Sequence, residues 1–351
     1  NTLSNYGARS TLALESSWMY KISGIDEKIN GIVVPQNALD VQWEADIWIT
    51  DPPYADAVNY HELSEFFLAW AEKILPQMFP DWYADSKRAL AITGSSDSFR
   101  KKMADCYHNL AIHMPENGMQ IVMFTHQDAS VWADLALILW SAGLRVTAAW
   151  CIATETNSSL KQGNYVQGTV LLVLRKQITE DTAFLDEIYP RVDEEVRRQL
   201  AEMSALDDKE DPNFSDTDYQ LAAYAAALRV LTSYRRIEEI DVQRELVKVR
   251  AKGEVSPLEE VIREAVKIAC NYQIPTGLDK EVWRGLSADE RFYIKGLELE
   301  SHGEYRTGAY QEFAKGFGIK EYSFMLSSGK ANQTRLKTAS EFAGRNLGGE
   351  G

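Results

Sequence analysis

Cysteine is scarce in this sequence of 351 residues, which contains only Cys106, Cys151 and Cys270. Three widely spaced cysteines have neither the spacing of zinc ligands nor the even number of a disulfide framework. We therefore expect no metal site, and reduced thiols in a cytoplasmic protein. Long apolar runs are missing too, since the best candidate, residues 131–144, is short and is interrupted by Asp134. No membrane span is expected.

The start of the chain has no basic stretch followed by an apolar one, so no secretory signal peptide is expected. Residue 1 is asparagine rather than methionine. We therefore expect a piece of a longer protein.

Positive charge is also in short supply. Lys and Arg number 37 against 52 Asp and Glu, a formal net charge of −15. This balance argues against a surface that is basic throughout, which many nucleic-acid-binding proteins have. Much of the acidity is local, however, because residues 180–218 hold fourteen acidic and four basic residues, a net of −10. A local basic groove elsewhere stays open.

Residues 45–54 are the most informative stretch of the sequence, because an apolar run stops there at two prolines. The run Ile47-Trp48-Ile49 predicts a central strand buried on both faces. The prolines cannot continue a strand because they donate no ladder hydrogen bond. The chain is therefore expected to be rigid just past the carboxyl end of a strand, where open α/β sheets bind their ligands.

The residues at this turn, Asp51-Pro52-Pro53-Tyr54, suit chemistry on the exocyclic amine of a nucleobase. Such an amine is a poor nucleophile because its lone pair is delocalised into the ring. The carboxylate of Asp51 and the carbonyl of Pro52 can accept its two N–H bonds, while Tyr54 stacks on the ring of a flipped base. The alternative is an ordinary turn that ends a strand.

The tetrapeptide resembles the catalytic motif of the amino-methyltransferases, which methylate adenine N6 or cytosine N4 with S-adenosylmethionine. The longer stretch of residues 50–70, with Asp56, Tyr60 and Ser64-Glu65-Phe66-Phe67 after the motif, is similar to a family of large DNA-adenine methylases. Those proteins carry an N-terminal domain of unknown function and often occur with phage-defence genes. The resemblance implies S-adenosylmethionine as cofactor, and DNA and other defence-system proteins as partners. Adenine is favoured over cytosine by this resemblance alone.

The resemblance also implies roles for individual residues. The expected catalytic set is Asp51, Pro52, Pro53 and Tyr54. The expected cofactor contacts are Asn37, Thr50 and Asp51. The expected substrate contacts are Tyr54, Asn59, Tyr60 and His126. Two of these have an equally plain structural reading, since Asn37 suits a turn after a strand and a single histidine is usually structural.

Local signals predict the elements that follow. Residues 59–75 form an amphipathic helix that is expected to pack on the sheet through Leu63, Phe66, Phe67, Trp70 and Ile74, and Pro76 ends it. A helix over 95–114, a strand over 119–126 and a helix from Asp128 to Gly143 come next. Strands over 144–153 and 168–174 complete the series. This order resembles the second half of a Rossmann-like methyltransferase.

The expected fold class is therefore α/β, a partial Rossmann-like methyltransferase sheet (its catalytic half) followed by a mostly α-helical domain. The predicted domains are 1–176, the half-core; 177–214, a solvated acidic helix and linker; and 215–351, the helical domain. Ser256 and Ser287 each open a helix with a capping box. Gly316 and Gly318 follow a helical pattern, and we interpret them as a helix terminus.

One motif of the resembling family is missing. Its cofactor-binding turn is similar to Asp-Pro-Phe-x-Gly-Gly-Gly and precedes the catalytic motif, and no such stretch occurs here. We therefore expect a C-terminal fragment of a larger methylase that is inactive alone. Two other hypotheses stay open, a non-catalytic interaction module of a defence complex and an N-methyltransferase acting on RNA or protein.

Overall fold

The computed structural model describes residues 36–53, 60–80, 92, 96–126, 128–153, 168–206, 214, 216–251, 253–275, 277–301, 303, 305–330 and 332–342. The described residues 74–80 belong to one compact unit and the other described residues to a second. The first unit contributes the single-turn helix α3 (Leu75–Met78), which has Pro76 in its first turn. The prediction that Pro76 ends the preceding helix is wrong, because α2 (Tyr60–Ala71) already ends at Ala71.

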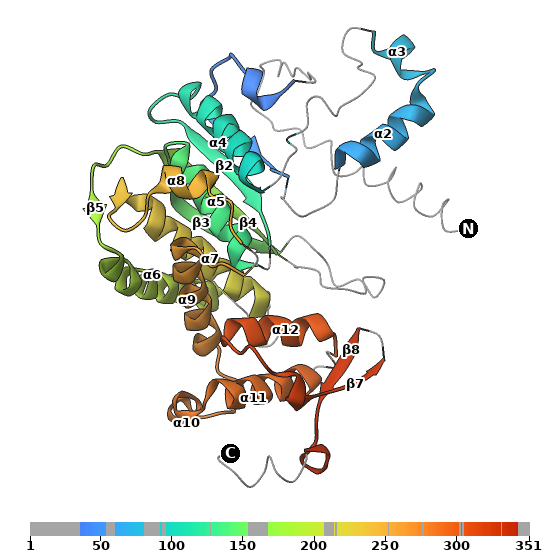
Figure 1. The fold of residues 1–351 in the computed structure, drawn as a ribbon, viewed down its shortest axis with the longest axis vertical. Coiled ribbons are helices and arrows are strands. Elements are labelled where there is room, and N and C mark those ends of the chain that lie inside the picture. Colours follow the sequence, from blue (N-terminus) through green and yellow to red (C-terminus); the bar gives the residue numbers. More distant parts are fainter. Residues whose placement is uncertain are drawn as a thin grey trace, which may run out of the picture. The chain divides into compact units, whose positions relative to one another are not determined.

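A mixed four-stranded sheet organises the second unit (Figure 1). Its strands are β1 (Ile47–Thr50), β2 (Met119–Phe124), β3 (Leu144–Ala153) and β4 (Gly168–Lys176), in the order β1-β2-β4-β3. The β1 and β2 strands are parallel, and β4 runs antiparallel to both of its neighbours. The predicted mixed α/β class is confirmed at this level.

The prediction of a central β1 buried on both faces is wrong. In the described sheet β1 is an edge strand, and its Ile47 and Ile49 side chains are 50% and 66% exposed. Apolar β-branched residues favour a strand whose side chains are buried. They do not determine which other element packs over those side chains. Trp48, on the opposite face, does pack against the core.

The two faces of the sheet differ. Side chains alternate along a strand, and residues paired across strands share a face. One face, here called the packed face, carries mostly buried residues: Trp48, Thr50, Gln120, Val122, Phe124, Leu144, Val146, Ala149, Cys151, Val170, Leu172 and Leu174. The other, here called the open face, is mainly apolar and largely partly or fully exposed: Ile47, Ile49, Met119, Ile121, Met123, Ala148, Trp150, Ile152, Leu171 and Val173, together with Arg145, Thr169 and Arg175.

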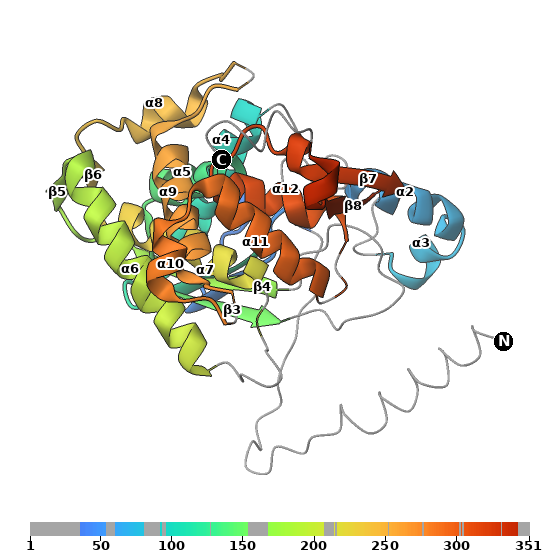
Figure 2. The ribbon, with the colours of Figure 1, turned by 90° about the horizontal axis from the view of Figure 1, so that it is seen from below.

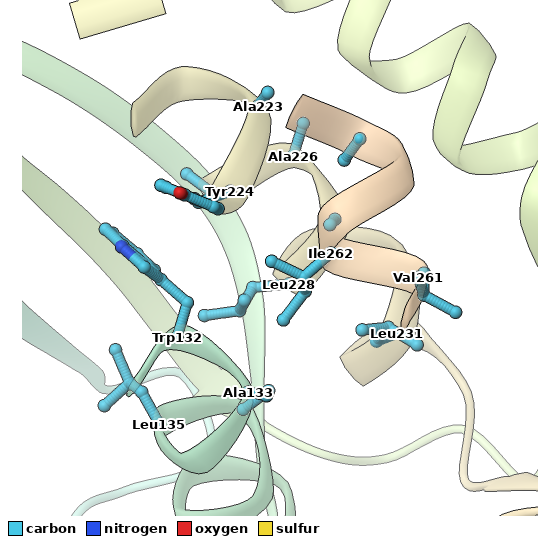
Figure 3. Close-up of a cluster of buried hydrophobic side chains, with 14 of the residues drawn as sticks. Trp132, Ala133, Leu135, Ala223, Tyr224, Ala226, Leu228, Leu231, Val261 and Ile262 are labelled. Atoms are coloured by element: carbon cyan, nitrogen blue, oxygen red, sulfur yellow. The ribbon is translucent and has the colours of Figure 1, made fainter. Parts of the chain in front are cut away.

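Helices α4 (Ser96–Ile112), α5 (Ala129–Ser141), α7 (Asp216–Ser233) and α9 (Pro257–Tyr272) form the main core with the packed face. In Figure 3 the side chains of Trp132, Tyr224, Leu228 and Ile262 point toward one another from α5, α7 and α9. Trp132 stacks on Tyr224 with ring centroids 5.3 Å apart. These fully or nearly fully buried side chains are the hydrophobic centre of the unit.

The local end signals of α5 are confirmed. Asp128 caps the helix, because its side chain accepts a hydrogen bond from the Ser130 backbone N–H at 2.9 Å. Gly143 follows the helix with a φ of +78°, a conformation that glycine adopts without steric cost. The N-cap at Ser256 and the capping box between Ser287 and Glu290 are also present.

The acidic segment forms α6 (Leu185–Leu206), an amphipathic helix rather than a merely solvated one. It packs against α7 and α9 (Figure 2) and buries one stripe: Ile188, Val192, Val196, Leu200 and Met203. Its charges pair on the outer side, for example Arg197 with Asp193. The predicted domain boundaries at 176 and 214 stay a prediction.

The remaining described elements are short or lie toward the C-terminus. They are η1 (Ala38–Asp40), β5 (Thr182–Ala183), β6 (Arg236–Ile237), α8 (Val242–Val247), α10 (Lys280–Gly285), α11 (Ala288–Ser301), α12 (Thr307–Gly316), η3 (Ser323–Met325), β7 (Leu326–Lys330), β8 (Gln333–Leu336) and η4 (Ala339–Glu341). The β7–β8 hairpin was not predicted. Gly316 ends α12, and a Cβ there would lie 2.3 Å from the Cys270 Sγ of α9, so this glycine permits close helix packing.

The prediction that α2 packs on the sheet is wrong for its described side chains. Leu63, Phe66, Phe67 and Trp70 are 51–81% exposed, and Phe66 contacts the rings of Phe67 and Trp70 instead. Among the described residues, no helix combines the length and apolarity that crossing a membrane requires.

Candidate functional site

The candidate site lies at the carboxyl end of β1. Because β1 and β2 are parallel, Asp51 after β1 and His126 after β2 follow strands that end at the same edge of the sheet. Tyr54 and Asn59, predicted to contact substrate, lie outside the described residues. Tyr60 begins α2, and only its backbone is described.

Pro52 anchors the turn. It is buried, whereas Asp51 and Pro53 on either side are exposed. A cavity of about 40 Å³ adjoins the two prolines, between α4 and α5. It is lined by Pro52, Pro53, Phe99, Met103, Phe124, Val131, Asp134, Leu135 and Ile138. A volume of this size accommodates about three water molecules at most, so neither a nucleobase nor a cofactor fits inside it.

Tyr107 of α4 supports the end of the strand from the packed face. Its hydroxyl lies 3.3 Å from Oγ1 of Thr50, the residue before Asp51. Burial raises the pKa of Tyr107 well above its usual value, although the hydrogen bond with Thr50 opposes this, and the nearby Asp51 carboxylate adds to the rise. The phenol therefore stays neutral and acts here as a support for the strand.

A network of ion pairs lies behind the cavity. Arg100, buried on α4, contacts Asp134 of α5 at 3.2 Å and donates to the backbone carbonyls of Leu246 and Lys248 at 2.9 and 2.7 Å. Arg250 pairs with the other Asp134 oxygen at 3.0 Å. These charge-assisted bonds fix α4 and α5 around the cavity that receives Pro52.

His126 has a local structural role. Its Nδ1 accepts a hydrogen bond from the Asp128 backbone N–H at 2.9 Å, and its carbonyl accepts one from Trp132 Nε1 at 2.7 Å. Asp128 in turn caps α5, and despite its partial burial the bonds from Ser130 lower the pKa of its carboxyl. The histidine thus joins the end of β2 to the start of α5, and contact with substrate stays a prediction.

Asn37 likewise has a local role. Its side-chain oxygen accepts a hydrogen bond from the Leu39 backbone N–H at 3.1 Å and caps η1. Asn109 of α4 holds the same turn by donating to the carbonyls of Ala38 and Val41 at 2.9 and 3.1 Å. The turn-forming reading of Asn37 agrees with this geometry, and contact with the cofactor stays a prediction.

The described residues do not fit S-adenosylmethionine as a complete cradle. Of the three predicted contacts, Asn37 is engaged with its own turn and Thr50 with Tyr107, which leaves the Asp51 carboxylate beside a cavity far too small for the cofactor. No group of three His, Cys, Asp or Glu side chains that could hold a metal ion occurs among the described residues. The described part of the chain therefore offers an exposed carboxylate at the turn after β1, without a cofactor pocket.

A larger cavity lies elsewhere among the described residues. It measures about 540 Å³ and is lined by residues that include Gly143 and Gln177, at the start of β3 and just past the end of β4. That edge is opposite to the one where Asp51 lies, because β3 runs parallel to β2. Its size does not outweigh the chemistry of the turn, since its charged lining residues are two arginines and two carboxylates, Arg235, Arg236, Glu238 and Asp241, whose opposite charges offset one another.

The chain matches no family model, no curated protein and no solved structure. Function therefore has to be inferred from the turn after β1 and its surroundings. Sequence reasoning missed three supporting residues there, Tyr107, Arg100 and Asp134. The polar positions of Arg100 and Asp134 within otherwise apolar helix faces were the one available signal, because such residues are seldom buried without a partner.

Proposed function

We propose that the protein serves the methylation of an exocyclic amine of a nucleobase in DNA, with adenine N6 as the favoured target and S-adenosylmethionine as the methyl donor. In this proposal it is the catalytic part of a larger methylase that acts in phage defence. The observation that carries the proposal is the Asp51-Pro52-Pro53 turn at the carboxyl end of β1, beside the parallel β2.

The sheet adds support. Its final strand pair brings the antiparallel β4 between β2 and β3, which agrees with the resemblance to the second half of a Rossmann-like methyltransferase. In such a sheet a ligand binds beyond the carboxyl ends of the parallel strands. Asp51 lies at that position, and its side chain is exposed.

The chain's own residues would hold and polarise the amine. The Asp51 carboxylate accepts one N–H and the Pro52 carbonyl the other, which draws the nitrogen lone pair out of the ring and toward the methyl donor. Pro52, buried beside α4 and α5, keeps both acceptors in place before substrate arrives. Tyr54 stacks on the flipped base.

A methyl-incorporation assay tests the proposal. The full-length protein is incubated with labelled S-adenosylmethionine and, in parallel, with DNA, RNA and protein acceptors. Label in DNA that is recovered as N6-methyladenine supports the proposal. Label in RNA alone or in protein alone would support the alternative of an RNA or protein N-methyltransferase. Label in no acceptor would contradict an enzymatic role.

The second candidate is a non-catalytic interaction module of a defence complex. Two observations favour it, the exposed apolar side chains of α2 and the open face and the net charge of −15. Asp51→Ala separates the candidates in a phage-infection assay with the full-length protein. Loss of both methylation and protection supports the enzyme, whereas protection without methylation supports the module.

A further inference from the structure

One face of α4 runs along the turn that carries Asp51. Phe99, Met103 and Tyr107 are spaced four residues apart on this helix, so their side chains lie on the same face of it. Phe99 and Met103 line the cavity that adjoins the two prolines of the turn, and the Tyr107 hydroxyl lies 3.3 Å from Thr50 Oγ1. All three helix side chains are buried. A single helix face therefore faces the chain on both sides of Asp51.

The strand itself gives the turn little support. β1 has four residues and pairs only with β2 in the described sheet, which leaves its outer edge open. Within the described part of the chain, the bond between Thr50 and Tyr107 ties a side chain of β1 to a helix. The other polar side-chain atom of the strand, Trp48 Nε1, is buried without a hydrogen-bond partner there. The position of this open edge at its carboxyl end therefore depends on Tyr107.

The backbone after Thr50 passes this position on to Asp51. Because Asp51 precedes Pro52, the proline ring excludes the α region for it and restricts it to extended conformations. Pro52 has its own φ fixed by the ring and is restricted in the same way by Pro53. The stretch from Thr50 to Pro53 therefore has little internal freedom, and a shift of Thr50 moves the Asp51 carboxylate with it.

Burial makes the hydroxyl bond a strong constraint. Tyr107 is 2% exposed, and its hydroxyl has Thr50 as its partner among the described residues. A buried hydroxyl that loses its only partner is strongly disfavoured, because it has already given up its hydrogen bonds to water. The bond therefore holds Thr50 Oγ1 against Tyr107 and keeps the end of β1 at a fixed distance from α4.

We infer that Tyr107 is a positioning residue for the reaction. Through its bond with Thr50 it sets where the Asp51 carboxylate lies, and hence how well that carboxylate polarises the exocyclic amine. This inference rests on the proposed function and deepens it, because it assigns a part in the reaction to a residue that is buried in the core. A misplacement of about 1 Å costs roughly a hundredfold in rate. The loss of one anchoring bond, with both prolines still in place, should cost less.

Steady-state kinetics of the full-length protein tests the inference, with kcat and the KM values for DNA and S-adenosylmethionine measured separately. Tyr107→Phe removes only the hydroxyl and should lower kcat about tenfold, with both KM values within about twofold. The matched control is Tyr293→Phe, which removes a hydroxyl that donates to the Lys337 carbonyl at 2.6 Å and should leave all three values unchanged. An equal fall in kcat for both variants would indicate general loosening and overturn the inference. A higher KM for S-adenosylmethionine at unchanged kcat would also overturn it.

A double-mutant cycle isolates the bond. Thr50→Val keeps the β-branched shape, removes the other hydroxyl and should also lower kcat about tenfold. If both residues act through one bond, the double variant should be about tenfold slower than the wild type, not about a hundredfold. Thr50→Ser retains a hydroxyl and should keep kcat within about threefold. A hundredfold loss in the double variant would mean two independent effects and overturn the inference.

Hydrogen exchange separates this inference from the proposed function, because it needs no methylation. In Tyr107→Phe the peptide that covers residues 47–53 should exchange at least about threefold faster than in the wild type, while a peptide from β2 should not change. Unchanged exchange at residues 47–53 would overturn the inference and leave the proposed function intact. If the wild type methylates no acceptor, the proposed function fails, and exchange at residues 47–53 alone decides whether Tyr107 positions the turn.

Discussion

The two edges of the sheet differ in whether helices hydrogen-bond to the backbone of the outer strand. At the β3 edge the Val146 backbone N–H donates to Thr232 Oγ1 of α7 at 2.9 Å, and the Ala149 carbonyl accepts from Gln199 Nε2 of α6 at 3.2 Å. At the β1 edge the described residues supply no such bonds, and Ile47 and Ile49 are exposed. Covering an edge with helices prevents unwanted strand pairing, so an uncovered edge is a feature to explain. The turn that suggests function lies on the uncovered side.

The largest expected effect contrasts two tryptophans on the two sides of the molecule. Trp132 is fully buried, stacks on Tyr224 and donates to the His126 carbonyl. Trp132→Ala should lower the free energy of unfolding by about 3–5 kcal/mol. Trp150 on the open face is 57% exposed, and Trp150→Ala should change it by less than about 0.5 kcal/mol.

Urea unfolding of residues 1–351, followed by circular dichroism, measures both values. Equal losses for the two variants would mean that the open face is covered within this chain. The comparison of faces would then be wrong.

The second prediction concerns activity at the open edge. Asp51→Ala should lower the methylation rate of the full-length protein about 100- to 1,000-fold, the usual cost of one preorganised polar contact in a transition state. Its stability should change little, because Asp51 is exposed. Asp46→Ala, at the exposed other end of β1, is the matched control and should keep the rate within about twofold. A normal rate for Asp51→Ala would remove this carboxylate from the mechanism.

Local sequence signals were sufficient for the elements that build the packed side. The cap at Asp128, the glycine at 143 and the serines at 256 and 287 each act on backbone groups within four residues, so the sequence alone determines them. The strand over 144–153 was predicted to the residue. The β7–β8 hairpin was missed because its strands are rich in polar and small residues and weak in β-forming ones.

The candidate site was less predictable, because its support comes from distant parts of the chain. Thr50 meets Tyr107, 57 positions later, and Arg100 meets the carbonyl of Lys248, 148 positions later. Such contacts between distant residues cannot be inferred from the local patterns of a single sequence. The apolar residues of β1 and α2 indicated surfaces that need a partner, but periodicity cannot tell whether that partner belongs to the same chain.

A third prediction weakens the covered edge. Thr232→Val keeps the shape of the side chain but removes the hydroxyl that accepts from the Val146 N–H and donates to the Leu228 carbonyl. The buried N–H then has no partner, which should cost about 1–3 kcal/mol of unfolding free energy. Ser233→Ala removes a neighbouring hydroxyl that bonds only within its own helix turn, at Val230, and should cost less than about 0.5 kcal/mol. Similar costs for both would show that the bond to β3 does not protect that edge.

The smallest expected effect is a gain in stability at Gln120, on a strand that lies between the two edges of the sheet. Gln120 of β2 is fully buried on the packed face, and neither its amide nitrogen nor its amide oxygen has a hydrogen-bond partner. It lies between Trp48 and Leu174 in the strand register. A buried amide without partners has lost its hydrogen bonds to water and has gained none in the protein. A methionine of similar shape has no such desolvation cost.

Gln120→Met should therefore raise the free energy of unfolding by about 1 kcal/mol. The same substitution at Gln177 is the control, because its Nε2 donates to the carbonyls of Thr232 and Tyr234 at 2.7 and 3.1 Å. Gln177→Met should destabilise the chain by about 1 kcal/mol. Denaturant midpoints at constant slope distinguish the two signs. If Gln120→Met destabilised the chain instead, its amide would have a partner in solution, and the packed face next to β1 would be less complete than the side of the sheet that carries β3.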